Sequence, residues 1–404
     1  MQLSRVAARL DSQFEMHDDP GCLNMKSESG FSRLKGLATA GAIGIAGLAG
    51  GNVARAASVG IPINITRGAA FWSSVGNNTS FPSSSTVTTT NGDVYTSDMT
   101  AFGIQDATLS DGSGGTFSDG VDNALILAVN GNLFVNPDTT VDLTGDTLTT
   151  DTVTIVPGVD AQIRYNFFPG RPVVRGLFSL TNTTAAPISV NAAILGDYGS
   201  DSNTTVRATS DGDTTIENSD FWYITDDLSA PTGPNGPTID RSKPHGASSP
   251  NAVLGSPDPR ITLSRYGAGA TVVPLNALTP GIAGPSQATF GLRYPVTIAA
   301  GQTVRIMVFM EMSDPTVSEA AAAAAAADFE SLDALQTAGL LTGLTPTEQS
   351  QLINYGQSGG PPPPATPPAS LPTATPTGLA ALLAALGGLG FFELRRRKKL
   401  ETTR

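Results

Sequence analysis

Residues 175–191 read Arg175-Gly-Leu-Phe-Ser-Leu-Thr-Asn-Thr-Thr-Ala-Ala-Pro-Ile-Ser-Val-Asn191. Apolar residues stand among small polar ones on both sides of a polar turn that ends in proline. This pattern is typical of half-buried strands joined by a tight connection. We therefore expect two antiparallel strands, Val173–Thr181 and Ile188–Leu195, that pair with each other across the turn.

The same pattern repeats between residue 57 and about residue 312, with turn signals at Asn130-Gly131-Asn132, Pro157-Gly158 and Pro169-Gly170. The further expected strands are Val59–Thr66, Ala124–Val129, Leu133–Val135, Thr147–Val156, Ala161–Phe168, Ile261–Arg265, Thr289–Ile298 and Thr303–Met312. A spacing of about ten residues between strands is typical of all-β sandwiches. We predict a mostly β fold, with a large, many-stranded antiparallel β-sandwich over residues 57–312.

Two parts of this region loosely resemble the large bacterial sandwiches that include the galactose-mutarotase-like fold. They are residues 175–191 and the turn with its following strand at residues 298–310. The resemblance implies a sandwich architecture, and it assigns no site residue to this chain.

Helical signals follow the last expected strand. Ser313-Asp314-Pro315 predicts a helix start, the alanines 320–327 continue the helix, and Gly339 ends it. Thr345-Pro346-Thr347-Glu348 has the spacing of a capping box and predicts a second, short helix to about Asn354. We expect this helical segment, residues 313–356, to pack on the sandwich, since helices gain most of their stability by docking an apolar face. Residues 357–370, rich in Gly and Pro, predict an extended linker.

Charge is scarce and unevenly distributed. Only 14% of the residues are charged, and the formal net charge is −12. The ends, 1–56 and 372–404, hold 12 of the 23 basic residues but 7 of the 35 acidic ones, so 11 basic and 28 acidic residues remain in between. A surface this acidic repels phosphate backbones, so we predict no nucleic-acid partner.

The N-terminal region has the three parts of a secretory signal peptide. Lys26, Arg33 and Lys35 precede a weakly apolar run, which ends in Ala54-Arg55-Ala56. We predict that the export machinery recognises residues 1–56 and that cleavage follows Ala56, with Met25 as an alternative start. The single cysteine, Cys22, lies in the part that would be removed.

The C-terminal region, residues 371–404, combines a short motif, an apolar run and a basic cluster. Residues 378–394 are apolar apart from one glutamate and are just long enough for a single transmembrane helix. The basic stop consists of Arg395, Arg396, Arg397, Lys398 and Lys399. Basic residues favour the cytoplasmic side, so we expect the body of the protein outside the inner membrane.

This tail resembles the C-terminal sorting signals of Gram-negative bacteria, of the IPTL-CTERM and PEP-CTERM type. The residues that correspond to the IPTL-CTERM motif are Leu371, Pro372, Thr373, Gly378 and Leu379, whereas Ala374 and Thr375 depart from it. The resemblance implies a membrane-embedded sorting enzyme as partner, cleavage near the motif, and transfer to the cell surface or to surface polysaccharide. A plain permanent membrane anchor is the alternative. The basic cluster after the apolar run argues against a GPI signal.

Acidic loops raise the question of a metal. Asp197, Asp201, Asp211 and Asp213 lie on one acidic stretch, and carboxylates on flexible loops can bind calcium. The spacing does not match an EF-hand, and Asp and Gly are also the usual residues of turns. We predict no cofactor, with calcium as the alternative. His245 is the single histidine after residue 56, which excludes a histidine-rich zinc site.

We predict no nucleophilic catalysis, since the only candidate base after residue 56 is His245, which lies in a proline-rich stretch. Carbohydrate chemistry would need two carboxylates, and the candidates are Glu217, Asp220, Asp226, Asp227 and Glu311. The aromatic residues that could stack on sugar rings are Trp72, Trp222 and Tyr223. We predict a non-catalytic structural, adhesive or matrix-associated surface protein, with a carbohydrate-binding or carbohydrate-processing protein as the alternative. Buried tryptophans would favour the first of these.

Overall fold

The computed structural model describes residues 56–356, except residues 83–85, 97–98, 113–114, 201–203, 228–237, 240–252, 255–257, 279–281 and 284–288. Ala56 is exposed and directly precedes the first strand. Most of the predicted signal peptide, including Ala54, lies outside these residues, as do the linker at 357–370 and the whole tail at 371–404. Among the described helices, none combines the length and the apolar composition needed to cross a membrane.

The largest sheet, called sheet A here, has the strand order β1-β11-β12-β14-β15-β25-β21-β18-β17, with β13 paired to β14. Every pairing in it is antiparallel. Its strands are β1 (Ala57–Gly60), β11 (Thr140–Thr144), β12 (Thr147–Thr149), β13 (Val153–Val156), β14 (Val159–Phe167), β15 (Val173–Asn182), β17 (Thr205–Thr209), β18 (Trp222–Asp226), β21 (Arg260–Ser264) and β25 (Thr303–Ser313).

A second antiparallel sheet, called sheet F, has the order β10-β9-β16-β24-β22, with β23 paired to β24. Its strands are β9 (Asn123–Val129), β10 (Asn132–Leu133), β16 (Ile188–Asp197), β22 (Leu275–Asn276), β23 (Ile282–Ala283) and β24 (Thr289–Ile298). A third sheet contains β2 (Ile63–Arg67), β3 (Ala70–Ser80), β6 (Thr100–Gly103), β7 (Asp106–Ser110) and β8 (Thr116–Phe117). Two small pairs remain, β4 (Val87–Thr88) with β5 (Val94–Tyr95), and β19 (Thr238–Ile239) with β20 (Val253–Leu254).

The main hydrophobic core is formed by buried side chains of sheets A and F and of the third sheet. Ile163, Phe178 and Ile306 from sheet A belong to the same buried cluster as Ile194 and Leu292 from sheet F. Alternating residues of each strand point to this core because successive side chains of a strand face opposite sides. The predicted mostly β class, built from antiparallel strands, is therefore confirmed.

The predicted pairing of the strands on either side of residues 183–187 is wrong. β15 pairs with β14 and β25 in sheet A, whereas β16 pairs with β9 and β24 in sheet F. The connection thus crosses from one sheet to the other. Asn182 stabilises the crossing, because its buried Nδ2 donates to the carbonyl oxygens of Ala186 (2.7 Å) and Ile298 (2.9 Å). The expected single strand Val59–Thr66 is also divided, into β1 and β2.

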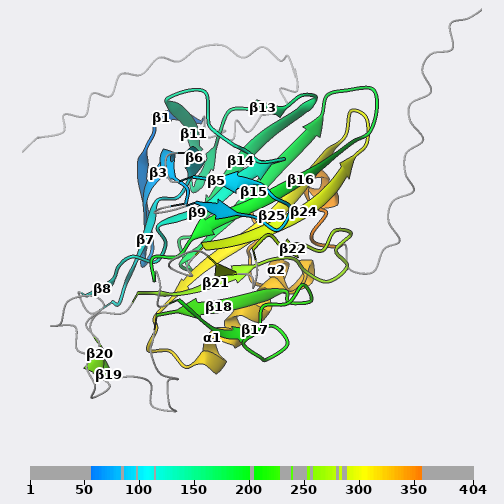
Figure 1. The fold of residues 1–404 in the computed structure, drawn as a ribbon. Coiled ribbons are helices and arrows are strands. Elements are labelled where there is room, and N and C mark those ends of the chain that lie inside the picture. The colour runs from blue at the N-terminus through cyan, green and yellow to red at the C-terminus, as the bar shows by residue number, and fades with distance from the viewer. Residues whose placement is uncertain are drawn as a thin grey trace, which may run out of the picture. The chain divides into compact units, whose positions relative to one another are not determined.

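A helical layer covers the outer face of the β15–β17 half of sheet A. It consists of α1 (Glu319–Ala326), the 3-10 turn η2 (Ala327–Phe329), α2 (Leu332–Thr337) and α3 (Pro346–Ser350). In Figure 1, α1 lies beside β17 and β18, and both strands contact it. Buried residues of this layer, such as Ala326, Phe329 and Leu335, form a second core with Leu177 and Phe309 of sheet A.

The first helix begins later than predicted. Its N-cap is Ser318, whose side chain accepts a hydrogen bond from the backbone N–H of Ala321. Asp314 instead forms a local turn, since its Oδ1 accepts from both the backbone N–H and the hydroxyl of Thr316. The capping box at Thr345 and Glu348 is present as expected, and it opens α3. Local helix signals in the sequence predicted where these helices lie. The side chain that caps α1, however, depends on the path of the chain after β25.

Candidate functional site

The two tryptophans lie in the interior. Trp72 is 0% exposed and Trp222 is 4% exposed. Trp72 packs against Phe167, with 6.0 Å between ring centroids. Trp222 lies under the helical layer, where its Nε1 donates to Glu330 Oε1 (3.0 Å). Tyr223 is buried as well, and its hydroxyl bonds with that of Tyr198 (3.0 Å). These rings are therefore parts of the core in this structure, and none of them forms an open stacking platform.

The carboxylates considered for sugar chemistry are engaged in internal bonds. Arg171 holds Glu311 with two N–H donors and also bonds Asp328 of η2. Asp226 lies between Arg207 and Arg260, and its side chain is 0% exposed. Asp220 accepts from the backbone N–H of Glu217 (2.6 Å). These acids stabilise the fold, and the structure does not bring them together at an open cleft.

The acidic residues considered for calcium lie on different elements. Asp197 ends β16 and accepts a bond from the Thr289 hydroxyl (3.3 Å). Asp211 and Asp213 lie on the turn between β17 and β18, where both accept from the hydroxyl of Thr209. Asp201 is outside the described residues. Within the described part of the chain, no group of three or more His, Cys, Asp or Glu side chains is placed to hold a metal ion.

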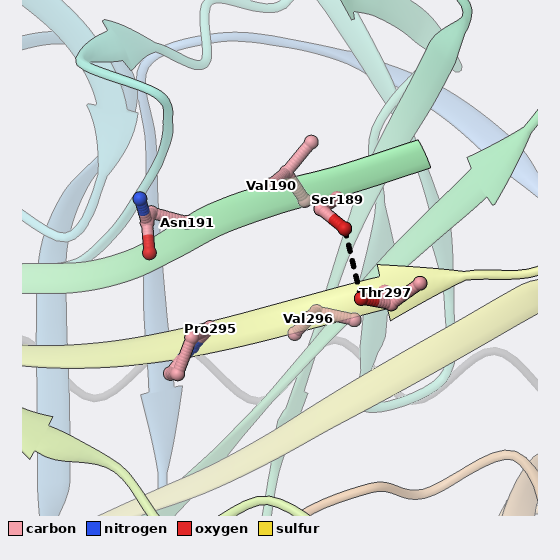
Figure 2. A pocket seen from close by; sticks show the side chains of 6 residues that line it. All are labelled: Ser189, Val190, Asn191, Pro295, Val296 and Thr297. Carbon is pink, nitrogen blue, oxygen red and sulfur yellow. Dashed lines mark hydrogen bonds between the residues drawn. The ribbon is translucent and has the colours of Figure 1, made fainter. Parts of the chain in front are cut away.

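A shallow depression of about 210 Å³ lies where β16 and β24 run side by side. Figure 2 shows its lining, with the Ser189 and Thr297 hydroxyls hydrogen-bonded across the two strands (2.9 Å). Asn191 and Pro295 lie opposite each other in the same register. The lining is neutral and has hydroxyl and amide groups, so it can hydrogen-bond a polar, uncharged ligand.

The most unusual charges lie on the outer face of sheet A, beside α3. Arg164 comes from β14, Arg175 from β15 and Arg305 from β25, and we call these three residues the arginine cluster. Arg164 Nη1 donates to Glu348 Oε1 (2.7 Å), and Arg305 Nη2 lies 3.9 Å from the same oxygen. Glu348 lies in the first turn of α3. Its contacts with these two arginines therefore connect the helical layer to β14 and β25.

Arg175 has a different environment. It is 1% exposed, and its guanidinium donates to the carbonyl oxygens of Leu340 (2.6 Å) and Thr342 (3.1 Å). Burial, together with the charge of Arg164, lowers the pKa of Arg175 to about 9. Burial likewise lowers the pKa of Arg305. In both cases burial is the largest cause of the lowered pKa, and the carboxylate of Glu348 opposes it.

Sequence reasoning missed this cluster. Arg305 is far from Arg164 and Arg175 in the chain, and only the pairing of β14 with β15 and of β15 with β25 brings the three together. One signal was available, since the outward positions Gln162, Arg164 and Asn166 alternate with Ala161, Ile163 and Tyr165. Polar residues at every second position indicate one solvated face, but not which other strands share it.

The ion pair at Glu348 predicts a pH effect. Burial raises the pKa of Glu348, but the bonds from Thr345 and Arg164 outweigh burial, so the folded pKa lies below the ordinary 4.5. A depressed carboxyl pKa stabilises the fold above its unfolded value, and the stabilisation is lost as pH falls through the folded value. We therefore expect wild type to unfold at a higher temperature than Glu348→Gln near pH 6, and this difference in unfolding midpoint to decrease as the pH falls to about 3.

Thermal unfolding of both proteins across this range is the measurement. Glutamine still accepts at the third position of a capping box, so the variant removes the charge and leaves the cap. A difference in unfolding midpoint that stays constant at every pH would contradict a stabilising ion pair at Glu348.

The comparisons with known proteins identify no family for this chain. No protein-family model matches the sequence, and the search of curated proteins finds no significant match. Three solved structures show some likeness, each at a low score. One is a polysaccharide lyase, 11% identical over 52% of this chain and 30% of its own, with a TM-score of 0.27. Another is the heparan sulfate lyase HepC from Pedobacter heparinus, 11% identical over 50% of this chain and 25% of its own, with a TM-score of 0.24.

The third is a candidate aldose 1-epimerase from Klebsiella pneumoniae, 9% identical over 67% of this chain and 90% of its own, with a TM-score of 0.31. The chain thus spans about a third or less of the two lyases. Likenesses at these scores transfer no site residue to this protein.

Proposed function

We propose that this protein is exported and held at the cell surface, where the sandwich acts as a structural or adhesive component without catalysis. The absence of catalysis is proposed because the candidate acidic residues form internal ion pairs and the candidate tryptophans are buried. Glu311 and Asp226 are each bound by arginines, and Trp72 and Trp222 are buried in the cores. These residues, which could have formed a sugar-processing cleft, therefore stabilise the fold instead.

The proposed location rests on the two ends of the sequence. Export follows from the signal-peptide features that end at Ala54 and Ala56. Retention follows from the single apolar segment at 378–394 and the basic residues after it. The motif at Leu371–Thr373 favours transfer by a membrane-embedded sorting enzyme over a permanent anchor. Surface polysaccharide is then the expected attachment partner.

Cell fractionation followed by mass spectrometry of the mature protein tests this location. We expect the mature N-terminus at Ala57 and a mature C-terminus near residues 371–373, in a surface fraction. A mature C-terminus that keeps Lys398 and Lys399 would replace sorting with the permanent anchor. An intact N-terminus in the cytosol would overturn export altogether.

Carbohydrate binding is the second candidate function. The depression between β16 and β24 favours it, because Ser189, Asn191 and Thr297 offer neutral hydrogen-bonding groups on a sheet face. The solved structures mentioned above are also named for action on carbohydrates. Binding of neutral oligosaccharides to wild type and to Asn191→Ala tests this candidate. Equal binding by the two proteins, or none by either, would remove the depression as a sugar site.

A further inference from the structure

The arginine cluster carries more positive charge than its surroundings balance. Two of its three guanidinium groups, those of Arg164 and Arg305, share one carboxylate, that of Glu348. Glu348 is itself fully used, because its Oε2 accepts from the backbone N–H (2.8 Å) and the hydroxyl (3.1 Å) of Thr345. Within the described residues, Arg175 makes its bonds to backbone carbonyls and has no ion pair.

Several donors in the cluster also have no partner. Arg164 Nε, Arg164 Nη2 and Arg175 Nε are buried and donate to no acceptor among the described residues. A buried guanidinium that lacks a counterion is costly, since burial removes the water that would otherwise solvate it. The free donors belong to adjacent strands, because β14 pairs with β15.

Four other arginines of the sandwich have a carboxylate partner, whereas Arg265 is, like Arg175, buried without an ion pair among the described residues and has an unpartnered Nε. Arg67, Arg171, Arg207 and Arg260 each form an ion pair with at least one carboxylate. Because acidic residues outnumber basic ones in this chain, 35 to 23, an excess of positive charge at one place needs an explanation. Structural ion pairing accounts for the four paired arginines but not for Arg175.

We propose that the arginine cluster binds an oxyanion, namely a carboxylate, sulfate or phosphate group. Guanidinium groups hold such anions through pairs of parallel N–H donors. The Arg164 and Arg305 side chains remain 20% and 17% exposed, so the cluster reaches the surface beside α3. The anion comes either free from solution or as the acidic group of a polysaccharide. The second source deepens the proposed surface function and rests on it.

Thermal unfolding of the full-length chain in a non-ionic polyoxyethylene detergent is the test. Sodium sulfate is titrated to about 10 mM against sodium chloride at equal ionic strength, because sulfate at higher concentration stabilises most proteins through exclusion from their surface. We expect a saturable rise of about 2 °C in the wild-type midpoint. Glu348→Gln should show a larger rise, because the internal carboxylate no longer competes for the arginines.

Arg164→Gln should lose the sulfate effect, and Arg305→Gln serves as a second variant should the first fail to fold. Arg67→Gln is the matched control, since it removes an arginine outside the cluster and should keep the wild-type response. A sulfate response equal to that of chloride in both wild type and Glu348→Gln would overturn the proposal. So would a response that Arg164→Gln and Arg305→Gln retain.

A second measurement separates the sources of the anion. The same proteins are passed over immobilised sulfated dextran, polygalacturonate and neutral dextran. Retention on either acidic polymer that depends on Arg164 assigns the site to a polysaccharide, whereas a sulfate response without retention assigns it to a free anion. Neither result depends on where the cell places the protein, so the proposed location and this site can fail independently.

Discussion

Replacing Arg260 with alanine is expected to lower the free energy of unfolding by about 3–5 kcal/mol. Arg260 and its partner Asp226 have side chains that are 0% exposed, and the shortest bond between them is 3.1 Å. Removing the arginine leaves a buried carboxylate short of positive charge, although Arg207 still pairs with it. The variant also frees the carbonyl of Val317, to which Arg260 donates (2.7 Å), and so loosens the segment that leads into α1.

The matched control is Arg67→Ala. Arg67 also pairs with an aspartate, Asp146, but the two side chains are 26% and 41% exposed. Exposed ion pairs contribute about 0–1 kcal/mol, because water competes for both charges. Denaturant titration of the two variants and wild type measures the difference. Equal losses for Arg260→Ala and Arg67→Ala would show that burial does not set the strength of these pairs.

Replacing Trp72 with alanine is expected to cost a similar amount, about 3–5 kcal/mol. Trp72 is 0% exposed and belongs to the main hydrophobic core. The expected loss combines the transfer of the indole ring with the cavity that remains beside Phe167. Trp72→Phe should cost much less. The indole N–H has no hydrogen-bond partner in the described part of the chain, so phenylalanine removes no bond.

This variant also tests whether Trp72 has a role in sugar binding. If Trp72 were a sugar-stacking residue, Trp72→Ala would abolish oligosaccharide binding while leaving the unfolding midpoint near that of wild type. We expect instead that Trp72→Ala lowers the unfolding midpoint, because Trp72 is a core residue. Val94→Ala is the control, since Val94 is 53% exposed and its truncation should change stability by no more than about 0.5 kcal/mol.

The strands were predictable because their signals are local. β14, β24 and β25 lie within one or two residues of their expected ranges, each bounded by a turn that contains glycine or proline. The capping box at Thr345 and Glu348 was predictable for the same reason, since all its bonds lie within four residues. The start of α1 after Ser318 was not, because Asp314 could cap a helix or close a turn, and the chain's exit from β25 selects the turn.

Strand pairing was beyond local reasoning. β15 and β16 are buried on both faces along most of their length. The helical layer covers one of these strands, and Phe81 and Tyr95 pack over the sheet that contains the other. A short turn between two apolar strands reads as a hairpin unless those covering layers are known. The alternation of residues therefore identified both strands but not the sheets to which they belong.

The sequence by itself determined the mostly β class, the position of most strands, the capped start of α3 and the predictions about both chain ends. Those properties depend on neighbours within about ten residues or on composition. The tertiary structure decided that the tryptophans are core residues and that Glu311 and Asp226 form ion pairs with arginines. It also decided that Arg164, Arg175 and Arg305 lie on the same face of sheet A. Such properties depend on which distant strands become neighbours, and burial and charge balance are set only when they do.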